Sequence, residues 1–184
     1  MQKFTVYNLE TAPEKSRSAL RTLQHSFGMI PNIAGAMAAS PTLINCLVGM
    51  FDTVHGASFS EAQMQTLLLT DAVTNRSEWA VAFHTALALG EGIDPADVQA
   101  MREGRSPNDP KLGALSTLAR TLIEKRGRLD DQEIDLFIKA GYSKELLLEA
   151  IATVAASTIT NYTGSITKPP LEAAFQPHAW QTGK

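Results

Sequence analysis

"TNRSEWAVAFHTALALG", residues 74–90, has the composition of a single, almost entirely apolar helix. From Glu78 to Gly90 it contains one carboxylate, one threonine and one imidazole, His84, and the other residues are Trp, Phe, Leu, Val, Ala and Gly. A helix that is apolar on nearly every side is buried on nearly every side. The sequence therefore predicts that His84 lies inside the protein, and it raises the question of what the imidazole does there.

The rest of the chain has the same helical character. No stretch alternates apolar and polar residues between turn signals, as a half-buried strand would. Residues that cap helix N-termini precede the periodic segments. They are Thr11 and Ser60, each with the Glu or Gln of a capping box three residues later, Ser40, Asp94 and Asp109, each followed by proline, and Asp130 and Ser143.

We therefore predict an all-α, single-domain helical bundle over residues 1–184, with 1–12 and 176–184 as peripheral arms. A chain of 184 residues is long enough for one well-buried domain. The tail after Pro169 is expected to be irregular, with a turn of helix at 170–175. The predicted helices cover about 12–27, 31–39, 41–56, 61–75, 77–90, 95–103, 110–126, 131–140 and 144–162.

Composition and charge exclude several classes of function. A net charge of −3 and the lack of any basic run argue against nucleic acid and anionic membrane as partners. The longest stretch with few charges, near 146–167, is interrupted by Glu149 and by several Ser, Thr and Asn residues, and it is too polar for a membrane span. The N-terminus has no apolar core of a signal peptide, so we expect a cytoplasmic protein. The charged stretch 120–131 is expected to be a solvated helix end.

Three segments are apolar or small on nearly every side: 64–73, 79–90 and 146–160. One chain of this size is not expected to bury three such helices alone. We therefore predict a homo-oligomer with helical interfaces.

No metal or cofactor site is predicted. The four histidines include no pair at the i,i+3 or i,i+4 spacing that places two imidazoles on one helix face, and Cys46 is the only cysteine. Neither a phosphate-binding loop after a strand nor a G-x-S-x-G motif is present.

One face of the 77–90 helix carries the remaining candidates. Ser77, Ala80 and His84 share one side of this helix, and Gln65 lies twelve residues before Ser77. If the helices 61–75 and 77–90 are antiparallel, Gln65 is expected near the start of the second helix. A substrate pocket would then lie between these two helices.

These residues resemble the active motif of the alkylhydroperoxidase D-like branch of the carboxymuconolactone decarboxylase family. That motif is a Glu, twelve residues later a Cys-x-x-Cys pair, and a His four residues after the second Cys; Gln65, Ser77, Ala80 and His84 fall on these positions. The similarity extends to "SFGMIPNIAGAMAASPTLI" (26–44), "FSEAQMQTLLL" (59–69) and "GYSKELLLEAIATVAASTITNYTGSITKPPLE" (141–172), and it covers roughly residues 15–180. The resemblance implies the all-α fold of the family and a trimer or hexamer.

The chain departs from the motif at three of its four positions. Without the two cysteines, thiol–disulfide exchange at this site is impossible. Gln65 cannot titrate, so a proton relay through Glu is lost as well. His84 retains an unperturbed pKa near neutrality and can act as an acid or a base, although burial would favour its neutral form.

The candidate site residues therefore have alternative roles. His84 is either a catalytic or ligand-contacting residue, or a core histidine bonded to hydroxyl groups such as those of Thr70, Thr74 or Thr85. Gln65 is either a hydrogen-bonding core residue or a ligand contact. Ser77 is a helix-start residue or, as a weaker candidate, catalytic, and Glu78 and Trp79 are weak candidates for substrate binding.

The first functional hypothesis is non-redox acid–base chemistry by His84 on a small organic acid or lactone. The alternative is a catalytically silent homo-oligomer that binds a ligand or a protein partner through the same cavity. A peroxidase that works through Cys46 alone comes last, because Cys46 lies in an apolar helix, where a free cysteine is expected to be a buried small hydrophobe.

Overall fold

The computed structural model describes residues 4–56 and 58–181, and within these residues it is all-α without a strand. The predicted helices are confirmed, with two differences: the last long helix continues to Thr167, and the turn in the tail lies at Ala173–His178. The helices are α1 (Glu14–Phe27), α2 (Asn32–Met37), α3 (Pro41–His55), α4 (Glu61–Thr74), α5 (Glu78–Gly90), α6 (Pro95–Arg102), α7 (Pro110–Glu124), α8 (Asp131–Lys139), α9 (Lys144–Thr167) and the 3₁₀ helix η1 (Ala173–His178).

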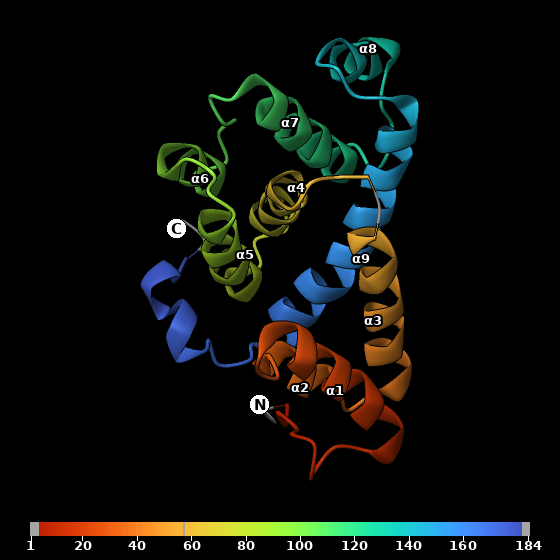
Figure 1. The fold of residues 1–184 in the computed structure, drawn as a ribbon, viewed down its shortest axis with the longest axis vertical. Helices are drawn as coiled ribbons and strands as arrows, with labels where there is room; N and C mark the ends of the chain where they lie inside the picture. The colour runs from red at the N-terminus through yellow and green to blue at the C-terminus, as the bar shows by residue number, and fades with distance from the viewer. Residues whose placement is uncertain (1–3, 57, 182–184) are drawn as a thin grey trace.

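Helix α4 is the centre of the bundle and packs against α5, α6, α7 and α9. Figure 1 shows α1, α2 and α3 toward one end of the long axis and α8 at the other. The long helix α9 connects these two ends and lies beside α3. The candidate site residues on α4 and α5 are therefore inside the bundle.

Two clusters of apolar side chains form the core, and α4 contributes to both. Leu69 and Ala72 pack with α5 in one cluster, while Met64, Leu67 and Leu68 pack with α7 and α9 in the other. Each fully buried leucine contributes about 1.5–3 kcal/mol of transfer free energy. Nearly the whole circumference of α4 is used in this way, which explains why the segment 64–73 lacks a polar face.

The expectation that one chain cannot bury three such helices is wrong for two of them. Residues 64–72 of α4 and 79–85 of α5 are buried within the single chain. Helix α9 differs, because it exposes large apolar side chains along one side. These are Leu148, Ile151, Tyr162 and Ile166, with exposed fractions of 65%, 45%, 60% and 67%.

The predicted N-caps are confirmed at six positions and wrong at one. Ser40, Ser60, Asp94, Asp109, Asp130 and Ser143 each accept a hydrogen bond from a backbone N–H in the first turn of their helix. At Thr11 the capping box does not form. The side chain of Asn8 accepts hydrogen bonds from the N–H and the hydroxyl of Thr11, and Pro13 is the N-cap of α1.

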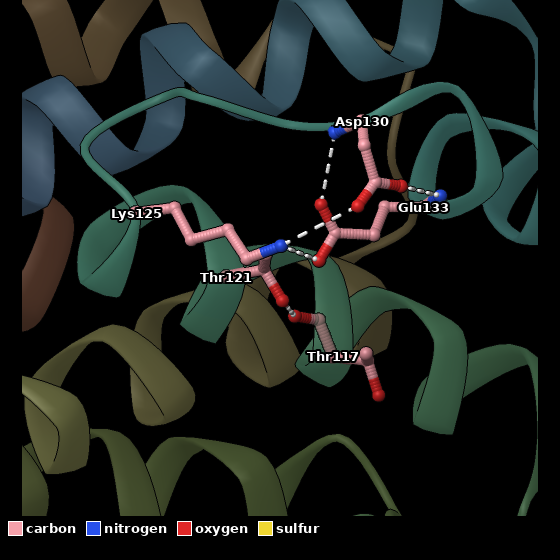
Figure 2. Close-up of polar contacts among 5 residues, drawn as sticks. All are labelled: Thr117, Thr121, Lys125, Asp130 and Glu133. Atoms are coloured by element: carbon pink, nitrogen blue, oxygen red, sulfur yellow. Dashed lines mark hydrogen bonds and ion pairs between the residues drawn. The ribbon is translucent and has the colours of Figure 1, made fainter.

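The turn from α7 to α8 is the solvated helix end that the charged stretch 120–131 predicted (Figure 2). Lys125 Nζ lies 2.5 Å from Glu133 Oε1 and 3.6 Å from Asp130 Oδ2, and the Lys125 side chain is 45% exposed. Asp130 and Glu133 also form the capping box that begins α8. This cluster fixes a surface turn and lies apart from the apolar core.

Both ends of the described chain pack onto the helices. Tyr7 N–H donates to Gly35 O over 3.1 Å, and a Cβ at position 35 would lie 2.6 Å from Val6 Cγ1, so this contact requires glycine. Trp180 Nε1–H donates to Arg102 O over 3.1 Å and holds the tail against α6. The outermost residues of the two predicted arms, 1–3 and 182–184, lie outside the described residues. Among the helices that the structure describes, none combines the length and the apolarity needed to cross a bilayer.

Candidate functional site

His84 and Gln65 meet in the interior, where α4 and α5 pack side by side. His84 Nδ1 lies 3.0 Å from Gln65 Oε1, and the two side chains are 5% and 4% exposed. Gln65 thus reaches the second turn of α5 rather than the start of the helix, where we had expected it. This amide, and not a threonine, is the hydrogen-bonding partner of His84.

The threonines expected as partners of His84 bond elsewhere. Thr74 and Thr85 donate their hydroxyl hydrogens to backbone carbonyls one turn earlier in their own helices. Thr70 donates to Ser116 Oγ on α7 over 3.0 Å. A hydroxyl in a helix commonly bonds to the preceding turn, which takes it away from other helices.

The His84 imidazole is neutral at physiological pH. Burial, together with a smaller effect of the charge of His55, lowers its pKa from 6.5 to about 3. Because the oxygen of Gln65 can only accept, the Nδ1 atom of a neutral His84 carries the hydrogen and Nε2 carries the lone pair. No hydrogen bond to Nε2 occurs among the described residues.

A cavity of about 420 Å³ lies beside this pair. Helices α4 and α5 form one side of it, as predicted, and α1 and α3 close the other side. Its apolar lining includes Leu23, Phe27, Leu47, Phe51, Trp79, Phe83 and Leu87, and its polar lining includes Asp52, His55, Glu61, Gln65, His84, Glu91 and Thr160.

Sequence reasoning missed the contribution of α1 and α3 to this cavity. Leu23 and Phe27 belong to a helical stripe, and so do Leu47 and Phe51, and such a stripe predicts a core face. The same periodicity describes a side chain that fills the core and one that borders a cavity. No signal in the sequence separated the two.

An aromatic cluster forms the wall next to His84. The ring of Phe83 stacks on Trp79 with centroids 4.9 Å apart, and it contacts the rings of Phe27, His84 and Phe175 edge to face. Trp79 Nε1–H donates to Glu172 Oε2 over 2.9 Å. Glu172 Oε1 in turn accepts the N–H of Asn32 over 2.6 Å, so the C-terminal segment fixes the cavity wall.

Ser77 and Ala80 do not line the cavity. Ser77 is the N-cap of α5 but makes no capping hydrogen bond, and its buried Oγ has no hydrogen-bond partner in the part of the chain that the structure describes. The hydroxyl instead lies against α9, where a Cβ at Gly164 would come within 3.1 Å of it. Ala80 is fully buried.

Trp79 and Glu78, the two weaker candidates for substrate binding, line different cavities in part. Trp79 lines the cavity beside His84 and also a second cavity of about 540 Å³ between α5, the end of α9 and the C-terminal segment. Glu78 lines only the second cavity, together with Arg76, Lys168 and Trp180.

Cys46 is exposed on α3, so the expectation that it is a buried hydrophobe is wrong. Its neighbour Leu47 points into the core and borders the cavity, whereas Cys46 is turned to the surface by the rotation of about 100° between successive helical residues. Cys46 does not line the cavity that contains His84.

A further buried carboxyl group, Asp71, escaped the sequence reading. It is fully buried on α4, and burial raises its pKa well above the ordinary value, although the nearby Ser157 hydroxyl lowers it in part. Among the described residues, neither carboxyl oxygen has a hydrogen bond of good geometry. The Ser157 hydroxyl oxygen accepts a hydrogen bond from Asn161 Nδ2 over 3.0 Å. The signal was present, since Asp71 is the only charged residue in the apolar segment 64–73. Elsewhere in the described chain, no group of three or more His, Cys, Asp or Glu side chains could hold a metal ion.

Comparison with solved structures identifies the fold. The chain is similar to an uncharacterized peroxidase-related protein from Ralstonia eutropha JMP134 with an alkylhydroperoxidase AhpD core, with a TM-score of 0.81, 14% identity, and coverage of 95% of this chain and 96% of that one. It is also similar to a debrominase Bmp8 variant with alanine in place of a cysteine, in complex with 2,3,4-tribromopyrrole. The TM-score is 0.80 and the identity 17%, and the match covers 97% of this chain and 96% of that one. A third similar structure is that of a peroxidase-related protein from Silicibacter sp. TM1040, with a TM-score of 0.78 and 16% identity. This match covers 95% of each chain.

No protein-family model matches the chain, and a search of curated proteins finds no match. The chain therefore has the alkylhydroperoxidase AhpD-like fold, as the resemblance in its sequence predicted. Three of its four motif positions, Gln65, Ser77 and Ala80, differ from the family motif.

Proposed function

We propose that the protein is a non-redox enzyme in which His84 accepts a proton from a small organic molecule bound in the cavity. The observation that carries the proposal is the 3.0 Å contact between His84 Nδ1 and Gln65 Oε1 at the edge of the cavity. This contact orients the imidazole and leaves the lone pair of Nε2 for a ligand. A general base needs such a lone pair within hydrogen-bond reach of the proton that it removes.

The proton transfer is linked to the charge of the substrate. In the step proposed, an X–H bond of the substrate breaks, the electron pair stays on the substrate, and an N–H bond forms at Nε2. With a pKa of about 3, His84 is a weak base in the empty cavity. The negative charge that develops on the substrate favours the imidazolium and raises this pKa as the proton moves.

Thiol peroxidase activity at the family site is not part of the proposal. A disulfide cycle requires two thiols within reach of each other, and the two motif positions hold Ser77 and Ala80. The only sulfhydryl group, that of Cys46, is exposed on α3 and outside the cavity. The residues at the site therefore support proton transfer rather than electron transfer.

The substrate class proposed from the sequence is a small organic acid or a lactone. A cavity of about 420 Å³ is in the size range of small-molecule sites, which lies between about 300 and 1,000 Å³. A protein of the same fold, the Bmp8 variant, holds 2,3,4-tribromopyrrole. That complex supports a small cyclic molecule as the ligand of this chain.

The alternative is an oligomeric protein that binds a ligand in this cavity without catalysis. One observation favours it: a histidine with a pKa of about 3 is a poor base unless the substrate supplies charge. In that case His84 Nε2 accepts a hydrogen bond from the ligand, and no bond is broken.

A panel of lactones and small organic acids in D₂O distinguishes the two proposals. NMR follows ring opening and the exchange of substrate C–H for deuterium in wild type, His84→Ala and the bulkier His84→Gln. Removal of a general base lowers the rate by about 10²–10⁴-fold. His25→Ala is the matched control, because His25 is exposed and does not line the cavity.

Equal turnover in wild type and in both folded His84 variants would eliminate His84 as the base. Binding of a panel member without turnover in wild type would favour the non-catalytic alternative. Circular dichroism of each variant checks that the fold is retained.

A further inference from the structure

The mouth of the cavity carries an excess of negative charge. Asp52, Glu61 and Glu91 line it, and all three are exposed. Among the described residues that line the cavity, His55 and the buried His84 are the only ones that can become cationic, and His55 Nδ1 lies 3.5 Å from Glu61 Oε1. No Lys or Arg is among the described residues that line this cavity. At neutral pH, where His84 is uncharged, at most one positive charge therefore opposes three carboxylates.

This distribution acts against an anionic ligand in two ways. A cleft lined by charge of one sign repels ligands of the same sign and lowers their local concentration. A carboxylate that nevertheless enters loses its hydration and finds no cation to replace it. His84 cannot supply this charge at neutral pH, because burial lowers its pKa to about 3.

The interior presents an apolar aromatic wall and a small number of polar atoms. Trp79 and Phe83 stack against each other there, with their centroids 4.9 Å apart. The neutral polar residues that line the same space are Thr22, Ser26, Gln65, His84 and Thr160. The oxygen of Gln65 is already engaged by His84 Nδ1, which leaves the lone pair of His84 Nε2 as an acceptor. The aromatic wall and this lone pair match one hydrogen-bond donor on a flat, otherwise apolar molecule.

We infer that the substrate of this cavity is a non-anionic, aromatic-sized molecule with an N–H or O–H donor, and that the carboxylates at the mouth exclude organic acids. The inference rests on the proposed function of the same cavity and narrows its substrate class. Of the two classes expected from the sequence, free acids are rejected, and a lactone remains only where it also carries a hydroxyl or N–H group that can donate to His84 Nε2. The donor group points to His84 Nε2, and the ring lies along Trp79 and Phe83.

A ligand series of one shape and three charges tests the inference. Benzamide, benzoate and benzylamine are titrated into wild-type protein at pH 7 and low salt, and NMR gives each dissociation constant. A few unit charges near the mouth, partly screened by water, predict that benzoate binds about tenfold more weakly than benzamide. Salt at 0.5 M should reduce the charge-dependent part of this difference, because the carboxylates are exposed.

The variant Asp52→Asn/Glu61→Gln identifies the source of the discrimination. It removes two charges from the mouth with little change of shape, and we expect it to bind benzoate more tightly while its affinity for benzamide is retained. Asp135→Asn/Glu124→Gln is the matched control, since both residues are exposed and lie outside the cavity. It should bind all three compounds as the wild type does.

Three outcomes would contradict the inference. If benzoate binds as tightly as benzamide, the exclusion of acids is wrong, while the cavity remains a ligand site. If the preference for benzamide is unchanged in the Asp52→Asn/Glu61→Gln variant, the carboxylates are not its cause. If none of the three compounds binds, both the inference and the proposed function of the cavity fail.

Discussion

Gln65 and His84 are nineteen residues apart in the chain and meet between α4 and α5, where Gln65 Oε1 lies 3.0 Å from His84 Nδ1. The amide oxygen accepts the Nδ1–H hydrogen and carries no charge of its own. A neutral partner therefore orients the imidazole without stabilising its protonated form. A charge introduced at residue 65 should therefore change the pKa of His84.

Gln65→Glu should raise the pKa of His84 above the value of about 3 in the wild type. An ionised carboxylate within hydrogen-bond distance favours the imidazolium, and each pKa unit corresponds to about 1.4 kcal/mol. NMR titration of the imidazole measures this change. The exposed residue Gln24 provides the control Gln24→Glu. An unchanged His84 titration in Gln65→Glu would show that the two side chains are not in contact.

Acid should destabilise the protein through His84. Its folded pKa of about 3 lies below the ordinary value of 6.5, so the unfolded state binds more protons between these two values. The free energy of unfolding therefore loses up to about 1.4 kcal/mol per pH unit from this group as the pH falls from 6.5 toward 3, and no such loss occurs above 6.5. Urea denaturation of wild type and His84→Gln at several pH values isolates the contribution. If the free energy of unfolding of wild type and of His84→Gln changes equally with pH below pH 6, the prediction is wrong.

Asp71 should change the pH dependence of stability in the opposite direction to His84. Burial raises its folded pKa, so the folded state retains a proton that the unfolded state loses above a pH of about 4. Stability from this group is complete below that pH and decreases by up to about 1.4 kcal/mol per unit as the pH rises toward the folded pKa. No charged residue lies on α9 between Glu149 and Lys168, so this helix offers Asp71 no counter-charge.

Asp71→Asn removes this titration and keeps the shape of the side chain. The stability of wild type relative to Asp71→Asn should therefore fall as the pH rises above about 4, because the His84 contribution is common to both proteins and cancels. Ser157→Ala is a second test, since the Ser157 hydroxyl opposes the effect of burial on Asp71. A constant difference across this pH range would mean that Asp71 is ionised in the folded protein.

The helices could be predicted because their signals are local. Ser60 and Gln63 form the capping box of α4 within a single turn, and no distant residue takes part. Thr11 shows the limit of such reasoning, since its hydroxyl has a competing partner three residues earlier, Asn8. A local motif predicts a cap correctly unless another local partner is available.

The site could be predicted only in part. The spacing of Gln65 and His84 placed both on facing helices, but the turn at which they meet depends on how α4 and α5 pack. Phe27 and Phe51 were indistinguishable from core residues, because an apolar periodic residue can face a neighbour or a cavity. Cys46 was misjudged for a related reason: the composition of its helix is apolar, whereas exposure is decided residue by residue.

Cys46 should have no part in peroxide chemistry. It lies on the surface of α3, away from the His84 cavity, so no base from that site reaches its sulfur. Wild type and Cys46→Ser should consume hydrogen peroxide and an organic hydroperoxide at equal, negligible rates in the presence of dithiothreitol. A rate in wild type that the substitution abolishes would instead establish a one-cysteine peroxidase.

The exposed apolar side chains of α9 are the surface most suited to self-association. Leu148, Ile151, Tyr162 and Ile166 lie along one side of the helix, and no charged residue interrupts them after Glu149. Large contiguous apolar surfaces commonly mark protein–protein interfaces. We expect the trimer or hexamer implied by the sequence resemblance to use this side of α9.

Leu148→Lys/Ile166→Lys should shift the oligomer toward monomers, because an interface that buries two ammonium groups without partners loses affinity. We expect the dissociation constant to rise more than about tenfold. Analytical ultracentrifugation over a range of concentrations measures this change. Leu136→Lys on α8, where Leu136 is 58% exposed, is the control for the loss of an exposed leucine. A wild-type protein that sediments as a monomer at every concentration would contradict the prediction, and an oligomer unaffected by the double substitution would place the interface on another surface.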